Sequence, residues 1–231
     1  MTICSLLELT ISGNVTLTEL TKQMSEICDQ AEEKNHAVVM LRFTDNAKQL
    51  NQWPGVASIQ DINRWERIVR RFERLSAVTL AAASGVVGGP TLDLLLATDY
   101  RLVTSDFILH IPVNALQVWP GMTIHRLANQ IGVAQSRRFL LGVHEINAQY
   151  AIDIDLINEI SESLNESIAK AVTKFSPIAN AEYALRRQLL LEAPTTSFEE
   201  AAAFASEIGA PYFETSCKQG QNVDEVFNQI Q

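Results

Sequence analysis

The chain has 231 residues, of which 47% are apolar and 19% are charged, and this length fits one large domain or two small ones. Its formal net charge of −9 repels nucleic acid and anionic membrane surfaces, so we expect neither as a partner. The three cysteines include no CxxC pair and no Cys/His cluster, which argues against a disulfide framework and a metal site and favours a reducing cytosol.

The first predicted elements are a strand over residues 3–11 and a helix that follows it. The strand segment lacks the basic start of a signal peptide, and no apolar run in the chain is long enough to cross a bilayer. We therefore expect a soluble, cytoplasmic protein. Thr16 and Glu19 fit a capping box at the start of the helix. The apolar residues that follow fall on one helical face: Leu17, Leu20, Met24, Ile27, Cys28 and Ala31.

A buried strand is predicted over residues 38–43, and an amphipathic helix over residues 59–75. The helix is rich in arginine, and Glu66 is placed one turn before Arg70, where the two could pair. The arginines form either a solvated helix face or a basic rim for a phosphate-bearing cofactor. The sequence leaves both interpretations open.

A second buried strand is predicted over residues 77–83, and it runs into a glycine-rich turn that ends at Gly89. Pro90 fits the first position of the next helix, where a missing N–H costs nothing. Such a turn either binds an anion or only reverses the chain. It matches neither the dinucleotide-binding GxGxxG nor the P-loop GxxxxGK[ST], and the chain lacks the GxSxG of serine hydrolases.

The rest of the chain is predicted to be mostly helical. Short strands are expected at residues 100–103 and 107–109, followed by helices with turns over residues 121–142 and 145–160. Residues 161–208 are largely helical, with breaks at Ser176-Pro177 and Ala193-Pro194. Strands that alternate with helices predict an α/β fold with a helical C-terminal part.

Residues 84–102 resemble the central motif of the crotonase (enoyl-CoA hydratase/isomerase) superfamily, which joins a glycine-rich turn to an acidic residue and to Ala-x-Asp-x-Arg. Further pieces match in order within residues 36–203: Trp119-Pro120-Gly121, Arg126-Leu127, Leu140-Leu141-Gly142 and Ile146-Asn147-Ala148. The resemblance implies a spiral of ββα units that assembles as a trimer or hexamer. It also implies an acyl thioester substrate, carried by coenzyme A or a carrier protein, and no resident cofactor or metal.

In this family two backbone N–H groups hold the thioester oxygen while it becomes an enolate. The resemblance places the first donor near Val56. The position of the second donor is Pro90, which has no N–H, so either Gly89 supplies this donor through a shifted loop or the oxyanion hole has one donor. Asp93 occupies the position of the first family glutamate, and Val113 that of the second, which leaves one proton-transferring carboxyl. This departure favours dehydration, isomerisation or decarboxylation over two-carboxylate hydration.

Two further assignments remain open. Asp93 is either the catalytic base or a first-turn acid that stabilises its helix. His110, just before the lost glutamate, is either a substitute acid/base or a plain strand-end histidine.

Within the superfamily the chain is most similar to the short DpgB-type accessory crotonases of 3,5-dihydroxyphenylacetyl-CoA biosynthesis. The shared segments are Asn63-Arg64-Trp65-Glu66, Trp119-Pro120-Gly121-Met122 and Leu189-Leu190-Leu191-Glu192-Ala193. This resemblance implies a lyase or isomerase that assists a type III polyketide synthase in antibiotic biosynthesis. The alternative is a non-catalytic subunit that binds such a synthase or a sister crotonase.

We predict three parts in the chain: a spiral core over residues 1–160, a helical region over 161–204 and an atypical tail over 205–231. The tail resembles the last strand and helix of Ras-like GTPases, particularly in Tyr212 to Lys218 and Gln221-Asn222-Val223. The P-loop, the switch regions and the guanine-reading motif are all missing from the sequence. A GTPase-related binding module would therefore rest on the tail alone.

Overall fold

A computed structural model describes residues 6–12, 15–34, 37–44, 57–111, 113–114, 117–142, 145–178, 181–197 and 200. The chain divides into two compact units, Met1–Leu185 and Arg186–Gln231. All strands of the described residues, and the candidate site, belong to the first unit. The boundaries predicted at residues 160 and 204 stay predictions.

The first unit is built on a five-stranded parallel sheet with the strand order β1-β2-β3-β5-β10. Its strands are β1 (Leu6–Ser12), β2 (Val38–Thr44), β3 (Val78–Ala83), β5 (Tyr100–Val103) and β10 (Glu159–Ile160). In the register of the sheet, Leu41 of β2 lies between Leu9 of β1 and Ala81 of β3. Parallel neighbours need crossover connections, and helices supply them here.

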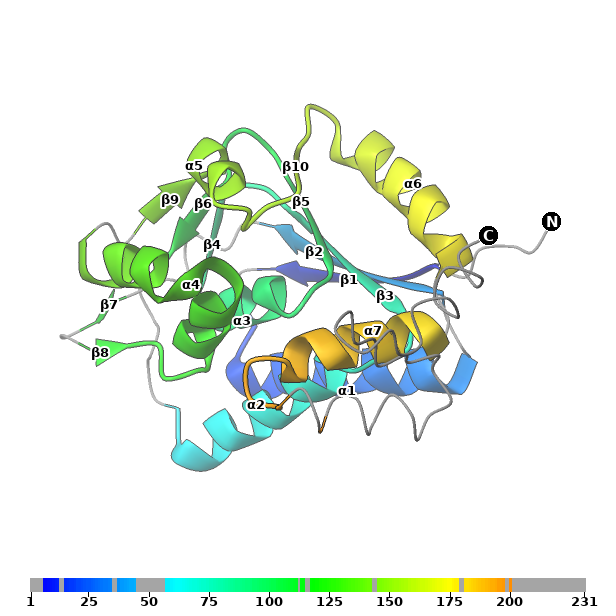
Figure 1. Cartoon of the computed structure of the whole chain (residues 1–231), viewed down its shortest axis with the longest axis horizontal. Coiled ribbons are helices and arrows are strands. Elements are labelled where there is room, and N and C mark those ends of the chain that lie inside the picture. The colour runs from blue at the N-terminus through cyan, green and yellow to red at the C-terminus, as the bar shows by residue number, and fades with distance from the viewer. Residues whose placement is uncertain are drawn as a thin grey trace, which may run out of the picture. The chain divides into compact units, whose positions relative to one another are not determined.

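Successive residues of β2 point to two different cores. Val39 and Leu41 lie in the main core with the buried faces of α1 (Leu17–Lys34) and α2 (Ile59–Glu73), whereas Met40 lies in a second core with α6 (Leu164–Phe175). Figure 1 shows α6 on the opposite side of the sheet from α1 and α2. Because both faces are covered, the central strands are continuous apolar runs, as the sequence predicted.

The first helix confirms its predicted apolar face, since all six residues named for it are buried. At its start, the Glu19 N–H donates to Thr16 Oγ1 at 3.2 Å, which is one half of the predicted capping box. A complete capping box lies at the start of α2, where Ser58 and Asp61 each accept from the other's backbone N–H.

The polar face of α2 is held by neighbouring helices. Arg71 binds Asp29 and Glu32 of α1 at 2.7 and 2.5 Å, which supports a fold-stabilising role for this arginine. The predicted pairing of Glu66 with Arg70 is wrong, because Glu66 instead binds Arg126 of α4 at 2.8 Å. The sequence favoured Arg70, one turn away on the same helix, but in the folded chain Glu66 pairs with the buried Arg126.

A smaller sheet with the order β4-β6-β9 stands beside the first, and it is formed by β4 (Val86–Gly88), β6 (Ile108–His110) and β9 (Glu145–Asn147). The residues of β4 were assigned to the glycine-rich turn, and those of β9 and β10 to a helical stretch. These assignments are corrected. Strands of two or three residues are too short to show an alternating pattern, and they form because distant segments pair with them.

The remaining elements keep the predicted breaks. Helix α3 (Pro90–Leu96) comes before a two-stranded ribbon formed by β7 (Val113–Asn114) and β8 (Gln117–Val118). Besides α6, the helices after the ribbon are α4 (Thr123–Gly142), α5 (Ala148–Asp153) and α7 (Ala181–Glu192). Pro90 is the first residue of α3, and α6 ends at Phe175, directly before the predicted break at Ser176-Pro177. Gly132 kinks α4. Of the helices described, none has the length and hydropathy needed to cross a membrane.

Candidate active site

Asp93, in the first turn of α3, lies at the centre of the site and has no exposed surface. Its Oδ2 accepts the indole N–H groups of Trp65 at 3.0 Å and Trp119 at 2.7 Å. Its Oδ1 accepts the hydroxyl of Thr123 at 2.5 Å and lies 3.8 Å from Arg126 Nη1. Burial raises the pKa of the Asp93 carboxyl above its ordinary value, because these four partners offset the loss of water only in part.

Three separate segments bring these side chains together. Trp65 comes from the buried stripe of α2, whereas Trp119 and Thr123 flank the turn that enters α4. Gly121 lies in that turn, directly against the carboxyl. A Cβ at Gly121 would stand 2.2 Å from both Asp93 Oδ2 and Trp119 Nε1, so only glycine lets the turn pass this closely.

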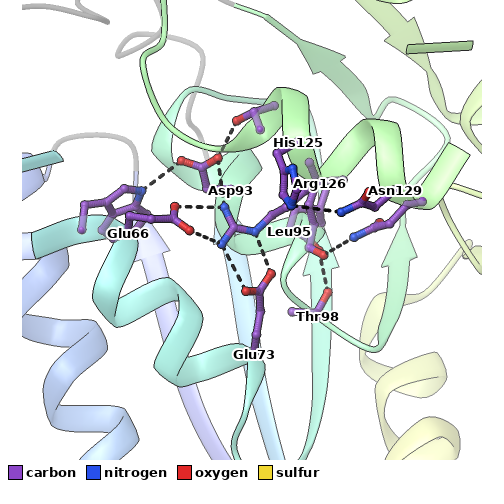
Figure 2. Close-up of polar contacts among 12 residues, drawn as sticks. Glu66, Glu73, Asp93, Leu95, Thr98, His125, Arg126 and Asn129 are labelled. Atoms are coloured by element: carbon purple, nitrogen blue, oxygen red, sulfur yellow. Dashed lines mark hydrogen bonds and ion pairs between the residues drawn. The ribbon is translucent and has the colours of Figure 1, made fainter. Parts of the chain in front are cut away.

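Arg126 joins the site to α2 through a second group of buried contacts, which Figure 2 shows around its guanidinium group. It donates to Glu66 at 2.8 and 3.1 Å and to Glu73 at 2.7 and 3.2 Å. Burial alone would lower the pKa of Arg126, but the bonds to the two glutamates outweigh it and raise the pKa. Arg126 also lowers the pKa of Asp93 through its charge, but this effect is smaller than the effect of burial.

Arg101 fixes the other end of α3. Its guanidinium group donates to the carbonyl oxygens of Leu95, Leu96 and Thr98 at 2.8 to 3.0 Å, and burial lowers its pKa to about 10. Asp99 accepts the N–H and the hydroxyl of Thr79. These contacts give Arg101 and Asp99 structural roles, and those of Arg101 hold the C-terminal end of α3, the helix that carries Asp93, in place.

A small apolar pocket lies beside the Asp93 network. Its volume of about 10 Å³ is the space of about one water molecule. Trp119 and Thr123 line this pocket and also bind Asp93, so Asp93 lies behind them. The lining residues are Gly89, Leu92, Ile111, Trp119, Thr123, Ile124 and Leu140.

Gly89 forms part of the wall of the pocket. It adopts a φ of 60°, in the region that favours glycine, and its carbonyl accepts the N–H of Leu92 at 3.1 Å. The role of the Gly89 N–H as an oxyanion donor stays a prediction.

Among the described residues, the contacts of His110 do not include Asp93. His110 ends β6, opposite Gly88 on one side and Glu145 on the other, and its Nδ1 lies 3.2 Å from Glu145 Oε1. The next residue, Ile111, lines the pocket, and successive side chains of an extended chain point to opposite faces. Val56 lies outside the described residues, and of Val113 only its place in β7 is described. The functional assignments of Asp93, His110, Val56 and Gly89 all stay predictions.

Sequence reasoning missed the partners of Asp93. Trp65 was assigned to an apolar stripe, and Trp119 and Arg126 served only as matches to a family pattern. The two tryptophans were themselves a signal, because a buried tryptophan usually needs a hydrogen-bond acceptor for its indole N–H. Few acidic residues lie in the apolar segment between Trp65 and Trp119, and Asp93 is one of them. No local pattern singled out Thr123.

Comparison with known proteins identifies the family of the chain. The chain is 36% identical over 180 residues to an enoyl-CoA hydratase from Amycolatopsis orientalis, in an alignment that covers 78% of this chain and 82% of that protein. The chain belongs to the enoyl-CoA hydratase/isomerase (crotonase) family. Its predicted superfamily and its α/β fold are thereby confirmed.

Solved structures agree on the fold of this crotonase. An enoyl-CoA hydratase/isomerase from Marinobacter aquaeolei superposes with a TM-score of 0.73 at 18% identity, covering 97% of this chain and 94% of that one. An enoyl-CoA hydratase from Mycobacterium smegmatis gives a TM-score of 0.73 at 16% identity, with coverage of 98% and 94%. At these identities the likeness concerns the fold alone.

The C-terminal part of this crotonase also matches the Ras family, over residues 159–231. That is less than half of the chain, and the matched segment begins inside the crotonase fold. Glu159 and Ile160 form β10, which pairs with β5, and α6 packs Ile168 and Ala171 into the second core. The tail predicted to resemble Ras-like GTPases lies within the matched range but outside the described residues.

Proposed function

We propose that this crotonase is a lyase or isomerase that acts on an acyl thioester through an enolate, with Asp93 as its only carboxyl base. The observation that carries the proposal is a buried carboxyl of raised pKa placed behind a pocket that Gly89, the predicted oxyanion donor, helps to line. A raised pKa brings a carboxyl closer to neutral pH, where it transfers protons best. One such group suffices for dehydration or isomerisation, because it can take a proton and return it.

We further propose that the enzyme assists a type III polyketide synthase in secondary metabolism. Its segments resemble those of the short accessory crotonases of 3,5-dihydroxyphenylacetyl-CoA biosynthesis. Turning a polyketide chain into an aromatic thioester requires loss of water, which suits one-base dehydration. The relative from Amycolatopsis orientalis is named an enoyl-CoA hydratase, and the same thioester class is proposed here, on coenzyme A or a carrier protein. A homotrimer or hexamer remains the expected assembly.

A second candidate is a non-catalytic subunit that binds a polyketide synthase or a sister crotonase. The size of the pocket favours it, since space for about one water molecule does not admit an acyl group without movement of a wall. Asp93 is also fully enclosed by two indoles and a hydroxyl, which favours the non-catalytic subunit as well.

An activity assay with matched variants separates the two candidates. Wild type, Asp93→Asn and the exposed control Asp106→Asn would be incubated with 3-hydroxyacyl-CoA thioesters of several chain lengths, and with a type III synthase supplied with malonyl-CoA. Products would be measured by mass spectrometry, and thioester binding by calorimetry. We expect Asp93→Asn to bind thioester but to lose about 100-fold or more in turnover, while Asp106→Asn matches wild type. Equal stimulation of the synthase by all three proteins would support the non-catalytic subunit instead.

A further inference from the structure

The two oxygens of the Asp93 carboxyl have different neighbours. Both indole N–H groups, from Trp65 and Trp119, donate to Oδ2, and an indole nitrogen can only donate. Oδ1 faces Arg126 at 3.8 Å, but a guanidinium group keeps its protons. It also faces the Thr123 hydroxyl, which can both donate and accept. Among the described residues, Thr123 is therefore the neighbour able to exchange a proton with Asp93.

The Asp93 carboxyl has no solvent-exposed surface in the structure. Asp93 is 0% exposed, whereas Thr123 keeps 5% of its surface and lines the pocket. A substrate in the pocket would meet the Thr123 hydroxyl before it could meet Asp93. Trp65, Trp119 and Gly121 are positioning residues in this arrangement, because they fix Oδ2 and so turn Oδ1 toward Thr123.

We propose that the Thr123 hydroxyl is the group that touches the substrate and relays protons between the pocket and Asp93. The proposal rests on the lyase function proposed above. In the dehydration of a 3-hydroxyacyl thioester, Thr123 Oγ1 takes the α-proton while its own proton moves to Asp93 Oδ1. The electrons of the broken C–H bond form the enolate, whose oxygen the Gly89 N–H can hold.

The second half of the relay restores the enzyme. The proton on Asp93 returns to Thr123 as Thr123 gives its proton to the β-hydroxyl group, which leaves as water. The enolate electrons form the new carbon–carbon double bond while the C–O bond breaks. Asp93 is then ionised and Thr123 protonated, as at the start, so the cycle needs no other reactant.

Two substitutions of Thr123 test this relay through its hydroxyl group. Thr123→Val keeps the side-chain shape and removes the hydroxyl, whereas Thr123→Ser keeps the hydroxyl. We expect kcat for dehydration to fall about 100-fold or more in Thr123→Val, with KM unchanged, and to stay within about tenfold of wild type in Thr123→Ser. The control Thr98→Val removes another buried hydroxyl, which bonds Leu95 O away from Asp93, and should keep the wild-type kcat.

A titration of Asp93 tests the same contact without turnover. Infrared difference spectra against Asp93→Asn would report the ionisation of this carboxyl in wild type, Thr123→Val and Thr123→Ser. We expect the midpoint to rise in Thr123→Val, because the ionised carboxyl loses its closest donor, and to stay near wild type in Thr123→Ser. An unchanged midpoint in Thr123→Val would overturn the relay.

The outcomes separate this proposal from the proposed function. If wild type is active and Thr123→Val keeps its kcat, the relay is overturned and the lyase function stands. If wild type converts no thioester in the panel, the lyase function fails and the relay fails with it. Loss of kcat in Thr123→Val with retention in Thr123→Ser supports both.

Discussion

At the residue scale, Asp93 exchanges contact with water for three hydrogen bonds and a distant cation, and its protonation is linked to folding. Its folded pKa is raised above the ordinary value of 3.8. Between these two pKa values the folded state binds more protons than the unfolded state, so the free energy of unfolding falls as pH rises through that window. Asparagine does not titrate, so Asp93→Asn removes this dependence.

We therefore predict that Asp93→Asn gains stability relative to wild type as pH rises from about 4 through the folded pKa of Asp93. The difference should grow by up to about 1.4 kcal/mol per pH unit inside the window and then level off. Urea unfolding of both proteins across this pH range measures it. A difference that stays constant with pH would show that the pKa of Asp93 is not raised by folding.

Gly121 gives a second prediction at this scale. Its backbone passes the Asp93–Trp119 hydrogen bond so closely that a Cβ would stand 2.2 Å from both atoms of that bond. Gly121→Ala should therefore lower the free energy of unfolding by about 2 kcal/mol or more, through overpacking and a strained buried hydrogen bond. Gly142→Ala is the matched control, because a Cβ there meets nothing within 4 Å. Similar thermal unfolding of the two variants would contradict this close approach.

At the element scale, one arginine of α4 joins α4 to α2. Arg126 is 6% exposed, and its partners Glu66 and Glu73 are 20% and 13% exposed, so the group is largely removed from water. The two glutamates lie seven residues apart, two turns of α2, and both face α4. The contact fixes the helix that carries Trp65 against the one that carries Thr123, and so holds both donors around Asp93.

Removing Arg126 would leave two half-buried carboxylates, and the fully buried Asp93, without a nearby cation. We predict that Arg126→Met lowers the free energy of unfolding by about 3–5 kcal/mol. Arg137→Met, an exposed position on the same helix, should change it by less than about 0.5 kcal/mol. Chemical denaturation of the three proteins at neutral pH makes the comparison. Equal losses in both variants would mean that the buried contact adds nothing to stability.

At the scale of the whole molecule, the chain belongs to the crotonase family, and its C-terminal part also matches the Ras family model. The crotonase likeness covers 78% of the chain, and the Ras likeness covers residues 159–231. Where the two overlap, β10 and α6 serve the crotonase sheet and its second core. The sequence contains no GxxxxGK[ST] phosphate-binding loop, which supplies the backbone N–H groups and the lysine that hold nucleotide phosphates.

We accordingly predict that the full-length protein does not bind guanine nucleotides. Titration with a fluorescent GDP analogue and magnesium should show no saturable signal at protein concentrations up to about 100 μM, a level that reveals even weak affinities. A Ras-family GTPase serves as the positive control. Saturable binding would give the C-terminal segment a function of its own.

The sequence by itself determined the elements whose signals are local. Helical periodicity gave the buried face of α1, the break before Ala193-Pro194 gave the end of α7, and Pro90 gave the first residue of α3. The ordered pieces of the crotonase pattern gave the family and singled out Asp93. The helix face and the helix ends depend on residues that are close together in the chain, and the family pattern depends on the order of its pieces. Spacing and order can both be read from the sequence.

Only the tertiary structure decided what surrounds Asp93. Trp65, Trp119 and Thr123 lie 26 to 30 residues from it and reach it from different segments. The partner of Glu66 lies 60 residues away on α4, and the short strands β4, β9 and β10 exist through pairing with distant segments. No local pattern contains these contacts, because burial and long-range pairing arise only when the chain is folded.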